Sequence, residues 1–125
     1  MQTALIIEDN ADNMVLITRL LEKAGYQTLH AWTGLEGVAK AIADAPDFII
    51  LDIQLPDVDG LEALRRIRAH EAARAIPVIA MTSYAMSGDR EKLLAAGCDG
   101  YIEKPIDPKW VIGQIQEVLQ QRRVA

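Results

Sequence analysis

Residues 48–60 read FIILDIQLPDVDG, and this stretch decides the fold that we expect. Four apolar residues in a row, 48–51, lead directly into the carboxylate of Asp52. A run that is apolar on both of its alternating faces suits a strand buried on both sides of a parallel sheet. Because an unpaired charge is costly inside such a sheet, we expect Asp52 to lie where the strand reaches the surface.

The composition of the chain indicates one globular domain. Half of the 125 residues are hydrophobic and a quarter are charged, and the net charge of -5 argues against a general nucleic-acid binding surface. The single cysteine, Cys98, excludes an internal disulfide and is expected to be a small core side chain. The chain lacks a secretory signal and an apolar run that could span a bilayer, so we expect a cytoplasmic protein. The short lead into the first strand and the finish after the last helix favour a complete small protein.

Five short apolar runs alternate with stretches of helical period along the whole chain. This alternation predicts an α/β fold with a parallel sheet, in which each strand is followed by a helix. The expected strands lie at 4–7, 28–32, 48–51, 77–81 and 100–102.

Local signals predict where several of the helices begin. Thr33 and Glu36 have the spacing of a capping box, which predicts a helix start at that point. Asp107 and Pro108 are expected to be the N-cap and the first residue of the last helix. The fourth helix, roughly 88–96, has a thin apolar face, so we expect it to be loosely held and able to shift.

Polar residues follow four of the expected strands. Ligand sites of open parallel α/β sheets form beyond the carboxyl ends of the strands, so these residues are expected at one edge. Taken singly, each has a structural explanation: Asp9 could cap the first helix, Thr82 could end a strand, and Lys104 could be solvated. Taken together they indicate a functional site. The polar ends are Glu8 and Asp9, Asp52, Thr82 and Ser83, and Glu103 and Lys104.

The three converging carboxylates predict a bound cation. Carboxylates about 4 Å apart repel each other by roughly 4 kcal/mol at an effective dielectric constant near 20, so bringing Glu8, Asp9 and Asp52 together is unfavourable without a metal ion. An all-oxygen site suits Mg2+, with Mn2+ as a substitute, whereas zinc is disfavoured by the absence of His and Cys at the strand ends. Beside such an ion a phosphoryl group is accommodated, which predicts phosphoryl transfer. Asp52 would be the nucleophile, and Lys104 and Thr82 would bind phosphoryl oxygens.

Four segments of the chain resemble the receiver domain of two-component response regulators, a CheY-like superfamily. They are IIEDN, FIILDIQLPDVDG, IAMTSYAMSGD and AGCDGYIEKPI, and the likeness covers essentially the whole chain. Within this family, the sequence of these segments is most similar to single-domain receivers of the DivK type and to receivers of hybrid histidine kinases. The resemblance implies a flavodoxin-like (βα)5 fold with a doubly wound parallel five-stranded sheet in the order 2-1-3-4-5, as a single receiver domain over residues 1–125.

The resemblance also implies a role for each residue at the strand ends. Asp52 would accept a phosphoryl group from a histidine kinase or a phosphotransfer protein, without the domain being an enzyme that acts on a separate substrate. Mg2+ would be held by Asp9, Asp52 and the backbone carbonyl of Gln54, with Glu8 acting through water. Thr82 would respond to the phosphoryl group.

Two further implications of the resemblance concern residues in and after the fifth strand. Lys104 matches the phosphoryl-binding lysine of the family, and its bond to Pro105 would be cis, an isomer accessible before proline. Tyr101 would form a switch pair with Thr82, in which the aromatic ring turns inward. From the residues alone, Tyr101 could also be a half-exposed strand aromatic.

The output is expected to be a protein contact on the face formed by the fourth helix, the fifth strand and the fifth helix. We expect phosphorylation to shift this face, to be read by a downstream target or relay, and to involve neither nucleic acid nor membrane. The domain would be a monomer or a weak dimer. Trp110, near the same face, could anchor a partner or pack at the start of the last helix, and we favour packing.

Two other functions share part of this pattern. A hydrolase with an aspartyl-phosphate intermediate usually carries a second aspartate two residues after the nucleophile, and here position 54 is glutamine. A flavodoxin-like cofactor binder needs hydroxyls or glycines after the first strand, whereas this chain has EDNADN, whose acids would repel a phosphate. Incubation with a small phosphodonor and Mg2+ separates these functions from that of a receiver.

Overall fold

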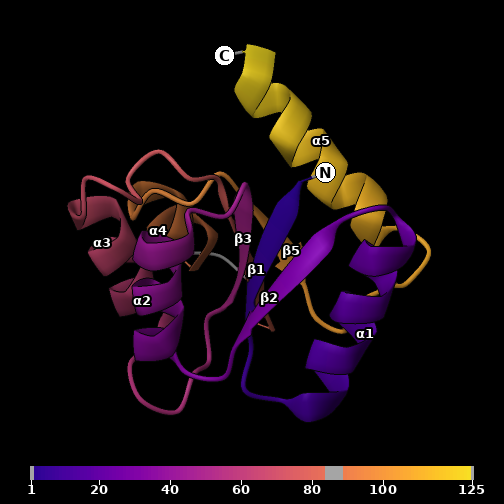
Figure 1. Cartoon of the computed structure of the whole chain (residues 1–125), viewed down its shortest axis with the longest axis horizontal. Helices are drawn as coiled ribbons and strands as arrows, with labels where there is room; N and C mark the ends of the chain where they lie inside the picture. Colours follow the sequence, from indigo (N-terminus) through magenta and orange to yellow (C-terminus); the bar gives the residue numbers. More distant parts are fainter. Residues whose placement is uncertain (1, 84–88, 125) are drawn as a thin grey trace.

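Five parallel strands form one sheet in the order β2-β1-β3-β4-β5, as the resemblance to receiver domains implies (Figure 1). We describe residues 2–83 and 89–124 of a computed structural model of the chain, and for residues 89–90 and 122–124 the backbone alone. Part of the segment IAMTSYAMSGD, from Tyr84 to Gly88, lies outside the described residues. The strands are β1 (Thr3–Ile7), β2 (Gln27–Ala31), β3 (Phe48–Asp52), β4 (Val78–Thr82) and β5 (Gly100–Glu103).

Helices cover both faces of the sheet in the described part of the chain. Helices α2, α3 and α4 lie on one face, and α1 and α5 lie on the other, which is the doubly wound arrangement (Figure 1). None of these helices combines the length and apolar character needed to cross a membrane. The helices are α1 (Ala11–Lys23), α2 (Gly34–Asp44), α3 (Gly60–Ala69), α4 (Asp89–Ala95) and α5 (Val111–Val124).

The sheet is buried on both sides, which explains the continuous apolar runs of the sequence. All five residues of β3 and of β4 are buried. Alternate strand residues point into two separate hydrophobic cores, one under α2 and α3 and one under α1 and α5. Cys98 lies in the first core, as expected, and burial raises the pKa of its thiol to about 11.

The helix starts follow the local signals in part. Thr33 caps α2, because its hydroxyl accepts a hydrogen bond from the backbone N–H of Glu36 at 3.1 Å. The Glu36 carboxylate reaches one residue further than a capping box requires and accepts from the N–H of Trp32 at 2.7 Å. The N-cap of α1 is Asn10, so capping does not explain Asp9.

The end of the chain differs from the sequence prediction in two ways. Regular helix α5 begins at Val111, because the Asp107 carboxylate accepts from the N–H of Lys109 and its carbonyl accepts from Trp110, which makes a turn before the helix. Trp110 lies in that turn and is 65% exposed, so the prediction that it packs is wrong.

Arg68 of α3 ties together the edge of the sheet that lies opposite the strand carboxyl ends. Its guanidinium donates to the carbonyls of Gly97 at 2.9 Å, Arg74 at 3.0 Å and Ile76 at 2.7 Å. It also forms an ion pair with Asp99 at 3.0 Å, and both side chains are 18% exposed. The two segments that lead into β4 and β5 are therefore fixed to the end of α3 by one side chain.

Candidate functional site

The polar strand ends predicted from the sequence lie at one edge of the sheet. The parallel register aligns Asp52 of β3 with Met81 of β4, and Thr82 of β4 with Glu103 of β5. Glu8 directly follows β1, the neighbour of β3 on its other side. The carboxyl ends of β1, β3, β4 and β5 therefore lie along one edge of the sheet, where ligand sites of open parallel sheets form.

Three carboxylates converge at this edge, as predicted. Glu8, Asp9 and Asp52 each present one oxygen, and these oxygens lie within 4.8 Å of one another. Glu8 is fully buried and Asp52 is 2% exposed, whereas Asp9 is exposed. The cluster thus has a buried floor of two acids and an open side at the third. We call these three residues the acidic pocket.

Backbone groups and one lysine hold the two buried carboxylates. The N–H of Asn10 donates to Oε1 of Glu8 at 3.1 Å, and the N–H of Gln54 donates to Oδ1 of Asp52 at 3.0 Å. The ammonium of Lys104 lies 3.1 Å from Oδ2 of Asp52 and 3.5 Å from Oε2 of Glu8. A single cation from the end of β5 therefore lies against both buried acids and offsets one of their two negative charges.

The surroundings of Glu8 in the pocket disfavour its ionised form. Burial, and then the negative charge of Asp52, raise the pKa of Glu8 from 4.5 to about 7, although the Asn10 N–H and Lys104 act in the opposite direction. Oε2 of Glu8 is buried and has no hydrogen-bond partner among the described residues. A buried oxygen that accepts no hydrogen bond from the described residues, with the Lys104 ammonium 3.5 Å away and two other carboxylates nearby, is the feature that a further cation would satisfy.

Local backbone packing fixes the position of Asp52. Helix α3 starts immediately behind it, and a Cβ at Gly60 would lie 2.4 Å from Cα of Ile53 and 2.7 Å from the carbonyl oxygen of Asp52. Only glycine therefore allows this approach. On the other side, the N–H of Ile53 donates to the Met81 carbonyl at 3.1 Å, which extends the pairing of β3 and β4 past the carboxylate.

Thr82 and Tyr101 take different positions relative to the acidic pocket. Thr82 is 2% exposed at the end of β4, and its carbonyl accepts from the N–H of Lys104 at 2.9 Å, so its strand is held against the lysine. Tyr101 is half-buried on β5, aligned with Ala80 two residues before Thr82. It lines cavities beside α5 instead of the acidic pocket.

The bond between Lys104 and Pro105 is cis, as predicted.

Asp57, in the loop after β3, is a residue that the sequence reasoning missed. Its carboxylate accepts from the backbone N–H groups of Gly34 at 2.8 Å and Leu35 at 2.9 Å, which are in the first turn of α2. These hydrogen bonds lower the pKa of Asp57 from 3.8 to about 2. The loop that leaves the acidic pocket is thus tied to the neighbouring helix.

The donor set of the pocket fits a hard divalent cation. All three side chains offer oxygen, and no histidine or cysteine belongs to the cluster found among the described residues. The fold and this pocket together define a domain of the CheY-like class with a flavodoxin-like fold.

Comparison with known proteins gives the family. Residues 4–116 match the family described as response regulator receiver domain, and the chain belongs to this family of two-component signalling domains. The polar-differentiation response regulator DivK of Brucella ovis is 43% identical over 118 residues, which cover 94% of this chain and 96% of the relative. The likeness to DivK-type receivers expected from the sequence is thereby confirmed.

Solved structures agree with the family. The receiver domain of a sensor histidine kinase of Pseudomonas aeruginosa is 38% identical with a TM-score of 0.84, covers 96% of this chain and 95% of its own, and is described with a magnesium ion coordinated in its active site cleft. The chemotaxis response regulator CheY4 of Vibrio cholerae is 26% identical with a TM-score of 0.90, and covers 94% of this chain and 98% of its own.

Proposed function

We propose that this receiver domain, over residues 1–125, accepts a phosphoryl group on Asp52 from a histidine kinase or a phosphotransfer protein. The observation that carries the proposal is the position of the buried Asp52 carboxylate, between the Lys104 ammonium at 3.1 Å and the other two acids of the pocket. The magnesium ion in the related kinase receiver supports the same use of this edge of the sheet.

Mg2+ would be held by Asp9, Asp52 and the backbone carbonyl of Gln54, with Glu8 acting through water, and Mn2+ would substitute. When bound, the ion offsets the negative charge of the carboxylates and of the incoming phosphoryl group. The solvent-exposed Asp9 leaves the open side by which an ion enters. Oε2 of Glu8, which accepts no hydrogen bond from the described residues, would accept one from that water.

The chain's own residues would position the transfer. A carboxylate oxygen of Asp52 forms a bond to phosphorus while the bond from phosphorus to the donor nitrogen breaks, and the electron pair stays with the donor imidazole. Lys104 pairs with an oxygen of the transferred group, and the Thr82 hydroxyl donates to another. The domain would assist its own phosphorylation and dephosphorylation without acting on a separate substrate.

The signal would leave the site through β4 and β5. The phosphoryl group would carry up to about two negative charges near Thr82, while Asp52 loses its own charge in the acyl phosphate, so the site gains about one negative charge in all. Movement of Thr82 toward the phosphoryl group would let the ring of Tyr101 turn inward and would bias α4, a helix of seven residues. A downstream protein would read the face formed by α4, β5 and α5, with the domain as a monomer or weak dimer in the cytoplasm, and without nucleic acid or membrane contacts.

Phosphorylation by a small phosphodonor tests the acceptor. Purified protein incubated with acetyl phosphate and Mg2+ should gain one labile phosphoryl group, measured by intact mass, and Asp52→Asn should gain none. Asp59→Asn is the matched control, because asparagine caps α3 as well as aspartate does. A phosphoryl group retained in Asp52→Asn would refute the assignment. Continuous turnover of the donor without a trapped adduct would indicate a phosphatase instead.

The response of the melting temperature to Mg2+ tests the metal site separately. Asp52→Asn removes one of two buried negative charges, so its melting temperature should rise in EDTA, and the stabilisation that Mg2+ gives should shrink. Thermal denaturation with and without Mg2+ measures both effects. If the Mg2+ response is the same in the variant and the wild type, Asp52 is not a ligand.

A further inference from the structure

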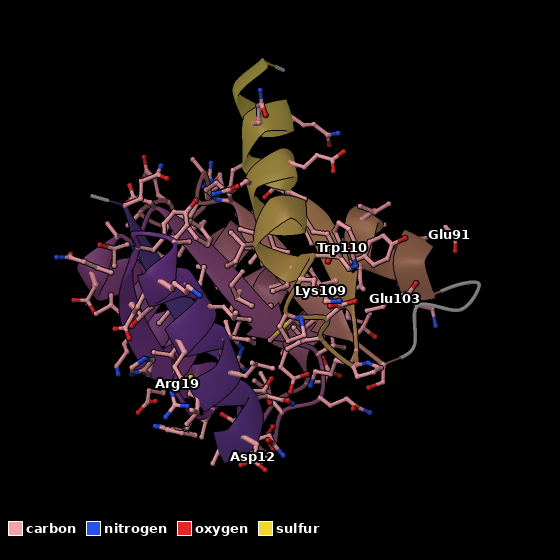
Figure 2. All side chains as sticks on the ribbon, turned by 90° about the vertical axis from the view of Figure 1, so that its right-hand side faces the viewer. Asp12, Arg19, Glu91, Glu103, Lys109 and Trp110 are labelled. Atoms are coloured by element: carbon pink, nitrogen blue, oxygen red, sulfur yellow. The ribbon has the colours of Figure 1, made fainter. Side chains whose placement is uncertain are left out.

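Trp110 is an aromatic side chain that the fold leaves in solvent. At 65% exposure it is the most exposed large hydrophobic side chain among the described residues. It stands in the turn before α5, and Figure 2 shows it with Lys109 and Glu103 beside the start of that helix. A tryptophan in this position does not contribute to the buried core, and aromatic residues of this kind are enriched where a partner binds.

An open cavity of about 340 Å³ lies directly against Trp110. Its walls combine two aromatic rings with two carboxylates and contain no lysine or arginine. The lining residues are Tyr101, Glu103, Pro105, Asp107, Trp110 and Gln114. A second cavity of about 350 Å³ shares Tyr101 and Gln114 with the first and has Leu94 and Val118 in its walls.

The two carboxylates of the first cavity are available to a cation. Neither Glu103 nor Asp107 forms an ion pair with another described residue, and both are exposed. One oxygen of Asp107 accepts from the backbone N–H of Lys109, which leaves the other for a ligand. Lys109 is exposed and does not line the cavity.

We propose that this cavity binds an arginine side chain of a protein partner. A guanidinium can stack on the Trp110 ring while its N–H groups pair with Glu103 and Asp107, whereas a lysine ammonium offers neither the plane nor the fork of donors. Leu94 and Val118 in the walls of the second cavity suit an aliphatic neighbour of that arginine. Phosphate-bearing partners, such as nucleic acid or an anionic lipid, would meet two carboxylates and be repelled.

The inference deepens the proposed function at one point, the regulation of binding by phosphorylation. Tyr101 lines both cavities, so an inward turn of its ring would change their shape. The affinity for the arginine should therefore differ between the unphosphorylated and the phosphorylated domain. Binding to the unphosphorylated domain does not depend on the phosphoacceptor at all.

Nuclear magnetic resonance of the indole N–H groups tests the cavity on the intact chain. The probe is a short synthetic peptide with one arginine between leucines, and its control carries citrulline, the neutral analogue, at the same position. In EDTA and without a phosphodonor, the arginine peptide should shift the Trp110 resonance saturably and leave that of Trp32, the other tryptophan, unchanged. The citrulline peptide should bind about tenfold more weakly.

Surface variants locate the contacts without disturbing the core. Trp110→Ala should weaken peptide binding about tenfold and Glu103→Gln up to about fivefold, followed through backbone amide shifts of β5. Glu71→Gln, an equal loss of charge at an exposed position between α3 and β4, should leave binding unchanged. Equal binding of the two peptides, equal shifts at Trp32, no shift at Trp110, or an equal effect of Glu71→Gln would each overturn the proposal.

Repeating the titration after acetyl phosphate and Mg2+ separates the two proposals. A changed affinity supports the link through Tyr101, and an unchanged affinity in protein shown by mass to be phosphorylated overturns that link. If no phosphoryl group is found on Asp52, the proposed function fails, while the titration in EDTA still decides the cavity.

Discussion

The substitution Glu8→Gln should change how the stability of the protein depends on pH when no divalent cation is present. Glu8 is fully buried, and its pKa is raised from 4.5 to about 7 by burial and by the charge of Asp52. The folded protein therefore holds a proton more tightly than the unfolded chain does. Stability from this group is fully present below about pH 4.5 and is lost as the pH rises through about 7.

The size of the effect follows from the difference between the two pKa values. At about 1.4 kcal/mol for each pKa unit, the rise from 4.5 to about 7 corresponds to about 3.5 kcal/mol in total. Between about pH 5 and pH 8, about 2.5 kcal/mol of this should be lost in the wild type. For a chain of 125 residues, that loss is a fall in melting temperature of about 10 °C.

Urea denaturation in EDTA at a series of pH values measures the loss, and Glu8→Gln supplies the reference because glutamine keeps the shape but does not titrate. The free energy of unfolding of the wild type, relative to that of Glu8→Gln, should be lowest at the highest pH. Asp9→Asn is the control at the exposed acid of the same pocket. If the free energies of unfolding of wild type and Glu8→Gln run parallel over this range, Glu8 is not the buried, perturbed acid that we describe.

Three further changes test the scaffold around the site. Arg68→Ala should lower the free energy of unfolding by about 3 kcal/mol in urea titration, since it strips the mostly buried Asp99 of its cation, and Arg68→Lys should lose less; a loss below about 0.5 kcal/mol would contradict this. Asp57→Ala should lower the melting temperature near neutral pH because the N–H groups of Gly34 and Leu35, at the start of α2, lose their acceptor, although Thr33 still caps the helix. Because the pKa of Asp57 is lowered, its contribution is present above 3.8 and lost toward about 2, so a deficit that persists at the lowest pH would exclude this cause. Gly113→Ala should raise stability by about 1 kcal/mol by thermal denaturation, since a Cβ there meets nothing within 4 Å; an unchanged or lower melting temperature would contradict it.

The convergence of the acidic pocket was predictable because it depends on strand order and direction alone. Asp52 directly follows a run that is buried on both sides, and Glu8 follows another, so a parallel sheet brings them to one edge whatever the loops do. The pattern could not tell which of the adjacent acids Glu8 and Asp9 would be buried. That depends on the Asn10 N–H and on Lys104, which reaches Glu8 from a strand near the far end of the sequence.

Two other features depend on contacts that no local pattern carries. Asp57 caps a helix that begins 23 residues earlier, and the loop in which it lies has no periodicity from which the pairing could be inferred. The phase of the last helix identifies Val111 and Ile115 as buried but does not fix where regular helix begins. The turn at Asp107 displaces that start to Val111 and places Trp110 in solvent, so of the two interpretations of this residue the one favoured from the sequence, packing, is wrong.

The charge of the acidic pocket offers a reason why one small domain can occupy two states. With all three acids ionised, Lys104 leaves two negative charges uncompensated, and a proton on Glu8 removes only one of them. A divalent cation would offset both and would favour the ionised form of Glu8, so proton and metal oppose each other through the charge of the same pocket. A phosphoryl group then brings the negative charge back at a new position, next to Thr82 instead of on Glu8. Under the proposed function the pocket would therefore change where its charge lies more than how much it holds, and groups on β4 and β5 would move to follow it.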